Sequence, residues 1–199
     1  MKNTSHSAKS IRLTLPSWLI EITAKPLVLP DPLERMAFVI DLSRRNVENA
    51  SGGPFAAAVF ESRTGLLLGA GVNRVEPLNC SPAHAEVLAI ACAQKKMKTY
   101  DLGADRAAPA ELLTSSQPCL MCLGAVLWSG VTRLVYGAAA EDVSTILGFD
   151  EGPLPGNWRG ELKQRGIGVE CEVLRNEAVA ILKLYKEKQG TVYNSRQGS

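Results

Sequence analysis

The sequence predicts an α/β fold, a three-layer α/β/α sandwich built on a mixed sheet of about five strands. The chain has 199 residues, of which 46% are hydrophobic, and this composition fits one globular domain with a sizeable core. Two apolar runs, 55–61 and 66–71, are joined by Ser62-Arg63-Thr64-Gly65, which predicts an antiparallel hairpin. From residue 111 onward, strand patterns alternate with helix patterns, which predicts right-handed crossovers and parallel pairing.

The first 30 residues are expected to form an N-terminal extension. Residues 1–10 are rich in Ser, Lys and Asn, a composition typical of disorder. Residues 16–30 are punctuated by Pro, so a semi-extended segment is expected there. Trp18 and Leu19 are its candidate anchors on the core.

One domain is predicted over residues 31–190, followed by a C-terminal tail, 191–199. Asp31 suits the N-cap of its first helix, because Pro32 stands at the first helical position and apolar residues follow at a spacing near 3.6. Further helices are expected at 84–98, at 119–129, from 140, at 158–166 and at 176–188. Further strands are expected at 111–115, 132–137 and 169–174, and a loop rich in Gly and Pro at 148–156.

Charge and composition exclude several classes of protein. The net charge is only +2 and no basic run reaches five residues, so the sequence lacks the electrostatic footprint of a strong phosphate-backbone binder. No apolar run reaches the roughly 18 to 20 residues of a membrane span, and the polar N-terminus lacks the apolar segment of a signal peptide. Five cysteines, an odd number, argue against a disulfide framework. We therefore expect a soluble cytoplasmic protein without a membrane or nucleic-acid partner.

Three residues in two separated motifs predict a metal site. His84 in Ala83-His84-Ala85-Glu86, with Cys119 and Cys122 in Pro118-Cys119-Leu120-Met121-Cys122, offers zinc one nitrogen and two thiolates and leaves a fourth position open. Pro82 and Pro118 favour helix starts, so both motifs are expected at helix N-termini. The two cysteines are i and i+3, so their sulfurs lie on one side of a first helical turn. The open position favours a catalytic zinc site over a structural one.

Glu86 is predicted to carry protons rather than to bind the metal. Residues i and i+2 do not face each other on a helix, so His84 and Glu86 are not expected to hold the same ion. A carboxylate beside an open metal position can take a proton from water whose pKa the metal brings down to roughly 7. The alternatives are a structural zinc knuckle, a redox Cys pair and two helix starts that carry cysteine by chance.

The sequence resembles the cytidine deaminase superfamily and, within it, the bacterial guanine deaminases. An H-x-E segment followed by P-C-x-x-C is the signature of the zinc deaminases. The likeness runs from about residue 52 to residue 152, and its other pieces are Gly53-Pro54-Phe55-Ala56-Ala57-Ala58-Val59, Asn73-Arg74-Val75 and Gly148-Phe149-Asp150-Glu151. The last piece favours guanine deaminases over tRNA adenosine deaminases, which share the others.

This resemblance implies an activity and a cofactor. A guanine deaminase hydrolyses guanine to xanthine and ammonia with one zinc ion per chain, which activates water while Glu86 shuttles protons. The resemblance further implies that Asn73 hydrogen-bonds the purine and that Glu151 helps move a proton to the leaving amine. Asp150 competes with Glu151 for that role, because many relatives carry Asp at the position of Glu151.

The resemblance also implies a homodimer, in which the C-terminal tail can reach the site of the partner subunit. Three aromatic residues, Phe149, Trp128 and Tyr193, are candidates to stack on the purine base. Tyr193 belongs to the tail, so its place in the site depends on where the tail runs.

Several other activities fit the same zinc motif. They include a tRNA adenosine deaminase, a deaminase of cytosine, cytidine or deoxycytidylate, and a deaminase of aminotriazines such as ammeline. A zinc module for protein association without catalysis is disfavoured, because a structural site has no need of Glu86. A riboflavin-pathway deaminase is disfavoured because those relatives space their two cysteines more widely than Cys119 and Cys122.

Overall fold

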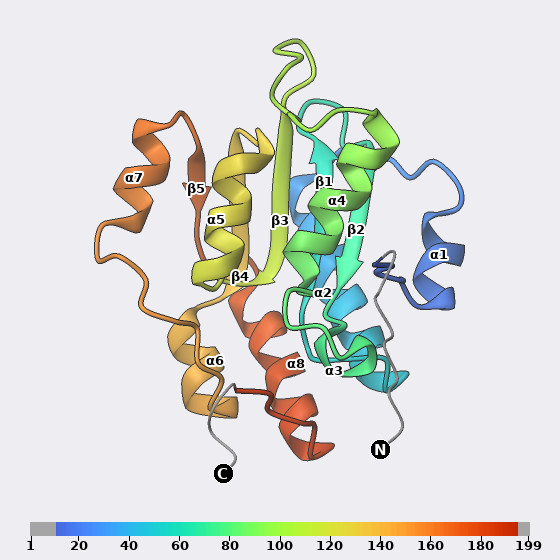
Figure 1. The fold of residues 1–199 in the computed structure, drawn as a ribbon, viewed down its shortest axis with the longest axis vertical. Coiled ribbons are helices and arrows are strands. Elements are labelled where there is room, and N and C mark those ends of the chain that lie inside the picture. Colours follow the sequence, from blue (N-terminus) through green and yellow to red (C-terminus); the bar gives the residue numbers. More distant parts are fainter. Residues whose placement is uncertain (1–10, 195–199) are drawn as a thin grey trace, which may run out of the picture.

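The computed structural model describes residues 11–194. The predictions of a disordered N-terminus and of the last five residues of the tail lie outside this range. Figure 1 shows the course of the chain. The helices are α1 (Ser17–Thr23), α2 (Pro32–Glu48), α3 (Val75–Leu78), α4 (Ala85–Met97), α5 (Leu120–Ser129), α6 (Ala140–Leu147), α7 (Trp158–Gln164) and α8 (Arg175–Glu187). The strands are β1 (Ala56–Glu61), β2 (Leu67–Val72), β3 (Ala110–Ser116), β4 (Arg133–Ala138) and β5 (Gly168–Glu170).

The five strands form one mixed sheet in the order β2-β1-β3-β4-β5. Strand β1 is antiparallel to both β2 and β3, whereas β3, β4 and β5 are parallel to one another. The hairpin, the parallel half and the number of strands predicted from the sequence are thereby confirmed. Because β3 and β4 are parallel, their carboxyl ends reach the same edge of the sheet, where α5 and α6 begin.

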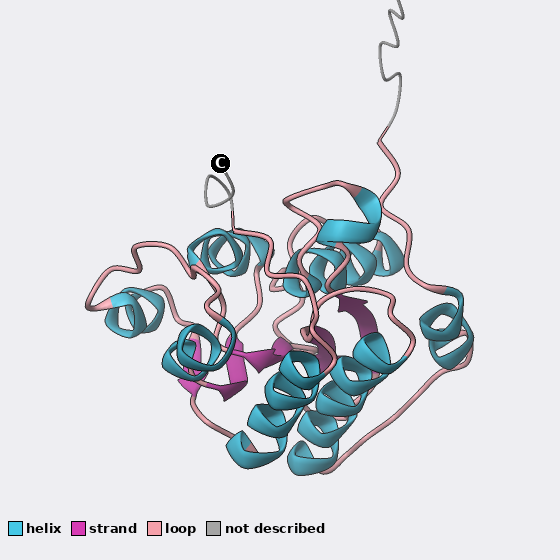
Figure 2. Ribbon diagram, turned by 90° about the horizontal axis from the view of Figure 1, so that it is seen from below, coloured by secondary structure: helices cyan, strands magenta, loops and turns pink. Residues whose placement is uncertain are grey.

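Helices cover both faces of the sheet, which makes the predicted three layers (Figure 2). Alternate residues of β1 belong to different cores, because successive side chains of a strand point to opposite faces. Ala56, Ala58 and Phe60 pack with α1, α2, α6 and α8. Ala57 and Val59 pack with α4, α5 and α7. The N-termini of α4 and α5, where the metal ligands were predicted, lie in the second of these layers.

Two glycines in β2 let α4 lie very close to the sheet. A Cβ atom at Gly71 would stand 2.4 Å from the carbonyl oxygen of Ala85, in the first turn of α4. A Cβ atom at Gly69 would stand 2.4 Å from the backbone nitrogen of Ala93. Neither contact is possible for a larger residue without a shift of the helix, so these glycines set where the N-terminus of α4 lies.

Residues 17–23 form a helix, so the semi-extended segment expected over residues 16–30 is wrong in this part. Tertiary packing explains the difference. Leu19 is fully buried in the first core, and the indole nitrogen of Trp18 donates to the hydroxyl of Ser51 at 3.1 Å. The two residues anchor the segment as expected, but a helical turn is what brings both to the core.

One further local prediction needs correction, and one short helix was not predicted. Strand β5 ends at Glu170 rather than continuing to residue 174, because Glu172 and Leu174 adopt left-handed conformations, with φ of 62° and 51°, that interrupt an extended chain. The single turn of α3 was not predicted, because four residues are too few to show a periodic pattern.

The described residues were also compared with the expectations on membrane spans and disulfides. Over residues 11–194, no helix combines the length and the apolar character that crossing a bilayer requires. All five cysteines lie in this range, and none of them is paired in a disulfide there.

Candidate active site

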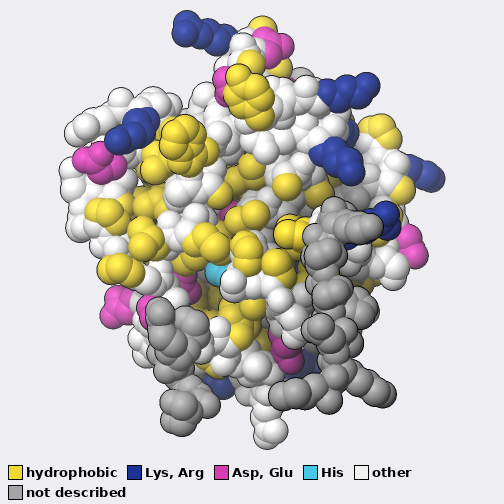
Figure 3. All heavy atoms as spheres, in the orientation of Figure 1, with side chains coloured by type: hydrophobic (Ala, Val, Ile, Leu, Met, Phe, Trp, Pro, Cys, Tyr) yellow, Lys and Arg dark blue, Asp and Glu magenta, His cyan; other side chains and the backbone are white. Residues whose placement is uncertain are grey.

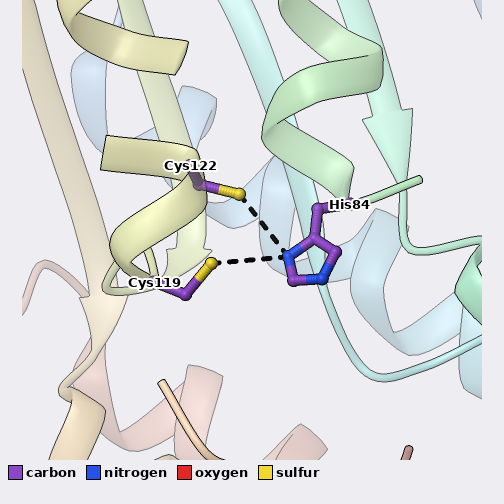
Figure 4. Close-up of side chains that lie close together, drawn as sticks. All are labelled: His84, Cys119 and Cys122. Atoms are coloured by element: carbon purple, nitrogen blue, oxygen red, sulfur yellow. Dashed lines mark hydrogen bonds between the residues drawn. The ribbon is translucent and has the colours of Figure 1, made fainter. Parts of the chain in front are cut away.

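The N-termini of α4 and α5 bring the three predicted metal ligands together. His84 is the N-cap of α4 and Cys119 is the N-cap of α5, and both have extended backbone conformations that leave their side chains outside the helical turn. Cys122 lies one turn into α5 and is buried. Figure 4 shows that the two sulfur atoms point toward the same nitrogen of the histidine ring.

The distances among these atoms fit a zinc ion. The Nδ1 atom of His84 is 3.6 Å from the Sγ atom of Cys119 and 3.5 Å from the Sγ atom of Cys122. Zinc binds thiolate at about 2.3 Å and histidine nitrogen at about 2.0 Å, so two such ligands of a tetrahedral ion lie about 3.5 Å apart. Among the described residues, His84, Cys119 and Cys122 could therefore hold the ion through three ligands, as in catalytic zinc sites that keep one position for a reacting molecule.

The electrostatics of the thiols suit a metal. A hydrogen bond from the Cys122 thiol lowers the pKa of Cys119 to about 4, with further help from His84 and against the effect of burial. The pKa of Cys122 is raised, because its proton is held by the Cys119 thiolate and because the residue is buried. The pKa of Cys119 is thus shifted well below that of Cys122, so Cys119 is the thiol of the pair that ionises first.

A cavity of about 370 Å³ opens onto these ligands. This volume is in the range of small-molecule sites. Its wall includes His84, Cys119 and all the other predicted site residues except Cys122 and Trp128. Cys122 is fully buried and does not line the cavity, although its Sγ atom is 3.5 Å from the Nδ1 atom of His84.

Glu86 lies in the first turn of α4, beside the ligands and at the wall of the cavity. Glu86 is buried, with only 6% of its surface exposed. Burial raises the pKa of its carboxyl, and the negative Cys119 raises it further. A carboxyl in these surroundings gains and loses a proton more readily near neutral pH than an exposed one, which suits a proton carrier.

Glu151 reaches the same cavity from the loop after α6. Burial raises its pKa to about 8, and the nearby Cys119 and Glu86 contribute to the shift. Asp150 also borders the cavity, but it is exposed and its Oδ1 atom accepts a hydrogen bond from the backbone of Gly152 at 2.9 Å. The burial of the Glu151 carboxyl favours its protonated form, which a group that donates a proton needs.

Asn73 and the rings of Phe149 and Tyr193 form another part of the cavity wall. Asn73 follows β2 and is almost fully buried, and its Nδ2 atom donates to the hydroxyl of Tyr193. The ring of Phe149 lies between those of Phe55 and Tyr193, with centroid distances of 5.4 Å and 4.8 Å. The ring of Tyr193 is also 6.3 Å from that of His84. The tail of the same chain therefore enters the site.

The comparison with protein families agrees with this geometry. Residues 32–138, more than half of the chain, match the cytidine and deoxycytidylate deaminase zinc-binding region. The matched range contains all three candidate zinc ligands and Glu86. The chain belongs to this deaminase family.

Individual members of the deaminase family give a finer comparison. The chain shares 50% identity with the solved structure of guanine deaminase from Nitrosomonas europaea, with a TM-score of 0.87 over 92% of this chain and 99% of that one. It is 36% identical over 112 residues to guanine deaminase of Bacillus subtilis, which is 56% of this chain and 67% of the relative. It is 31% identical over 135 residues to a tRNA-specific adenosine deaminase of Buchnera aphidicola, which is 67% of this chain and 80% of the relative.

Trp128 does not line the cavity of this deaminase-family chain. It lies on α5 and is 87% exposed. The structure therefore does not support the prediction that Trp128 stacks on a ligand in the cavity of its own chain. Trp128 is six residues beyond Cys122, and at 3.6 residues per turn this places it about 240° around the helix from the buried sulfur. A stacking role cannot be assigned from residue type alone, because the type does not say which face of a helix the ring occupies.

Two residues that contribute to the site carry no signal in the sequence. Gln117 lines the cavity just before the Cys119 helix, and Asn194 lines it from the tail. Asn194 is 44 residues from Asp150, whose backbone it contacts. Such a contact depends on the tertiary path of the tail and cannot be read from local spacing.

Proposed function

We propose that this chain is a zinc-dependent guanine deaminase, which hydrolyses guanine to xanthine and ammonia. The observation that carries the proposal is the cluster of three potential zinc ligands beside the carboxyls of Glu86 and Glu151 in one cavity. The 50% identity with the guanine deaminase of Nitrosomonas europaea over almost its whole length supports guanine as the substrate.

His84, Cys119 and Cys122 would hold one zinc ion per chain. When bound, zinc supplies a Lewis acid that makes water a good nucleophile near neutral pH. The protein adds what the metal cannot: it places a purine in the cavity, keeps competing water out and moves protons at the reacting atoms.

Two carboxyls divide the proton transfers. Glu86 takes a proton from the attacking water and delivers it to a ring nitrogen of guanine, while a C–O bond forms at the carbon that bears the amine. Glu151, whose pKa burial raises to about 8, would donate to the amine as the C–N bond breaks. The products are xanthine and ammonia. Glu86 has already passed its proton to the ring nitrogen, so the second proton of the water returns to Glu151.

Asn73 and Phe149 would orient the purine. The Asn73 amide carries both a donor and an acceptor, which suits the mixed edge of guanine. Its donor now reaches the hydroxyl of Tyr193, so a bound purine competes with Tyr193 or is read by both together. The ring of Phe149 offers a flat apolar surface of the kind that stacks on a base.

A tRNA adenosine deaminase is the second candidate, because a relative with that activity is 31% identical over most of its length. An enzyme that extrudes a base from tRNA needs many phosphate contacts, and its binding weakens steeply with salt. The net charge of +2 without a basic run favours the free base instead.

The test is ammonia release from guanine, adenine, cytosine, cytidine, ammeline and a tRNA anticodon stem by the zinc-loaded protein. Turnover of guanine that Glu86→Ala and Glu151→Ala both reduce is the expected result. Glu141→Gln, an exposed acid on α6, serves as the control for loss of a negative charge. Turnover of the RNA alone would assign the chain to the second candidate, and no turnover of any compound would refute both.

We further propose that the protein is a cytoplasmic homodimer. Helix α5 exposes four large apolar side chains, here called the α5 apolar face: Leu120, Met121, Leu127 and Trp128. Figure 3 shows hydrophobic side chains gathered across the side of the molecule that α4 and α5 cover. Exposed apolar surface of this kind supports an interface with a second copy. The free cysteines support a reducing compartment.

A further inference from the structure

The loop that carries Glu151 has few hydrogen bonds of its own. It runs from the end of α6 to α7, and Gly148 and Gly152 turn it through positive φ angles of 79° and 74°. Within it, the backbone of Gly152 donates to Asp150, and the backbone of Leu154 donates to the carbonyl of Gly152 at 3.0 Å. From outside the loop, the backbone of Leu120 in α5 donates to the carbonyl of Glu151 at 3.0 Å. The position of the Glu151 carboxyl therefore depends on contacts from outside the loop.

Asn194, in the tail, supplies such a contact with both ends of its amide. Its Nδ2 atom donates to the carbonyl of Gly148 at 2.7 Å, and its Oδ1 atom accepts from the backbone nitrogen of Asp150 at 2.9 Å. The two bonds flank Phe149, as the peptide group of a neighbouring strand would. One bond is made to the carbonyl of Gly148, the residue before Phe149. The other is made to the N–H of Asp150, the residue before Glu151.

The neighbouring tail residue contacts the same segment from the cavity side. The ring of Tyr193 packs on that of Phe149 at 4.8 Å, while its hydroxyl meets Asn73. Side chains of two consecutive tail residues thus hold the backbone and the ring of the 148–150 segment. Displacing Asn194 frees the loop at the residue before Glu151.

We propose that Asn194 is a positioning residue that holds the Glu151 loop in its productive place. The inference rests on the proposed function for what Glu151 does, but not for the contact itself. Asn194 acts through the loop backbone and not on the substrate, so its loss changes the step that needs Glu151 more than the binding of the purine.

Hydrogen exchange tests the contact without any activity. In the zinc-loaded full-length protein, Asn194→Ala is expected to speed exchange at the amide of Asp150 on the order of 10-fold, because that N–H loses its acceptor. Asn49→Ala is the matched control, since Asn49 is exposed and its side-chain amide donates to the carbonyl of Arg45 in α2 rather than to the loop. Unchanged exchange at Asp150 in Asn194→Ala would overturn the proposal.

Kinetics with guanine test the consequence. We expect Asn194→Ala to lower kcat on the order of 10-fold with little change in KM, since a small misplacement of a reacting group is costly. In a Glu151→Gln background the same change should lower kcat less than about 2-fold. Asn194→Asp, which keeps the acceptor for Asp150 and loses the donor for Gly148, should fall between wild type and Asn194→Ala.

The outcomes separate the two proposals. An equal loss in both backgrounds would show that Asn194 acts on the cavity independently of Glu151, and would overturn the positioning role. A wild-type protein that does not turn over guanine would refute the proposed function, while the exchange experiment would still decide whether Asn194 holds the loop.

Discussion

The proposed proton transfer by Glu86 can be tested separately from zinc binding. It lies at i+2 from His84 and its carboxyl faces the cavity, so its removal should leave the three zinc ligands in place. We expect Glu86→Gln to lower kcat on guanine by about 10² to 10⁴, the range for loss of a general acid or base. Bound zinc, measured by elemental analysis, should remain at one per chain.

The comparison for this variant is Cys119→Ala, which removes a ligand and should lose both zinc and activity. If Glu86→Gln also lost zinc, Glu86 would be a ligand rather than a proton carrier. Restoration of zinc to a chelated wild-type protein should recover activity, and the same treatment should leave Glu86→Gln inactive.

At the residue scale, local spacing was enough to predict the chemistry but not the whole wall of the cavity. His84 and Glu86 are two residues apart and Cys119 and Cys122 are three apart, so helix geometry fixes their relative directions. Trp128 lies on the same helix as the cysteines and faces away from the cavity, and Asn194 reaches it only through the path of the tail. Neither direction is encoded in a few neighbouring residues.

At the scale of elements, the close approach of α4 to β2 links packing to the metal. Gly71→Ala would place a methyl group 2.4 Å from the Ala85 carbonyl, and backbone cannot yield as a side-chain tip can. We expect the free energy of unfolding to fall by about 1 to 3 kcal/mol, the range for overpacking. Because Ala85 follows His84, zinc affinity should fall as well, which a competition titration with a chelator measures.

Gly156→Ala is the matched control for this change. A Cβ atom at Gly156 meets nothing within 4 Å, and its φ angle is not positive. It should alter neither stability nor zinc affinity. A Gly71→Ala protein with wild-type stability and affinity would mean that α4 can shift without moving its N-cap.

Asp142 joins α6 to α8 and so supports the helix that leads into the Glu151 loop. Its carboxylate accepts from the backbone of Ala139 at 2.9 Å and from two nitrogens of Arg175 at 2.8 Å and 2.9 Å. The bonds with Arg175 hold the pKa of Asp142 below its usual value of 3.8, although burial opposes them. We expect Asp142→Asn to cost about 1 kcal/mol at pH 7, comparable to the loss of a helix cap.

The pH dependence follows from the direction of this shift. A lowered folded-state pKa means that the contribution is complete above the unfolded value of 3.8 and is lost as the pH falls through the folded value. Urea unfolding of wild type and Asp142→Asn should give a constant difference from pH 7 to about 4.5, shrinking in more acid solution. Asp105→Asn, an exposed acid that accepts one backbone bond, is the control. A difference that grew on acidification would contradict the assignment.

The helices and strands were predictable wherever apolar residues recur at a regular spacing or a capping residue marks the start of a helix. Asp31 accepts from the backbone of Leu33 at 2.8 Å and opens α2 as expected. The N-terminal segment failed because Leu19 and Trp18 form a helix only when the core is present to bury them. Seven residues without that core are too few to form a stable helix in water.

At the scale of the whole molecule, the alternation of strands and helices was enough to predict the layers and the mixed sheet, but it does not locate an interface. The α5 apolar face gives the proposed homodimer a testable location. Trp128 is 87% exposed in the single chain, and aromatic residues that large commonly dominate the energy of an interface. Its position beside Leu127 places two apolar side chains on the solvent side of the helix that carries both cysteines.

Trp128→Asp should therefore weaken the dimer without touching the cavity. Sedimentation velocity of the zinc-loaded wild type should give a dimer at micromolar concentration, and the variant should dissociate at concentrations where wild type does not, because a desolvated charge would replace a buried ring. Ile20→Asp, a change of an exposed apolar residue on α1, should leave the mass unchanged.

If wild type is a monomer, or if Ile20→Asp alone dissociates it, the α5 apolar face is not the interface. If Trp128→Asp dissociates the dimer and keeps full activity, each site is complete within one chain, as the entry of Tyr193 into the cavity of its own chain implies.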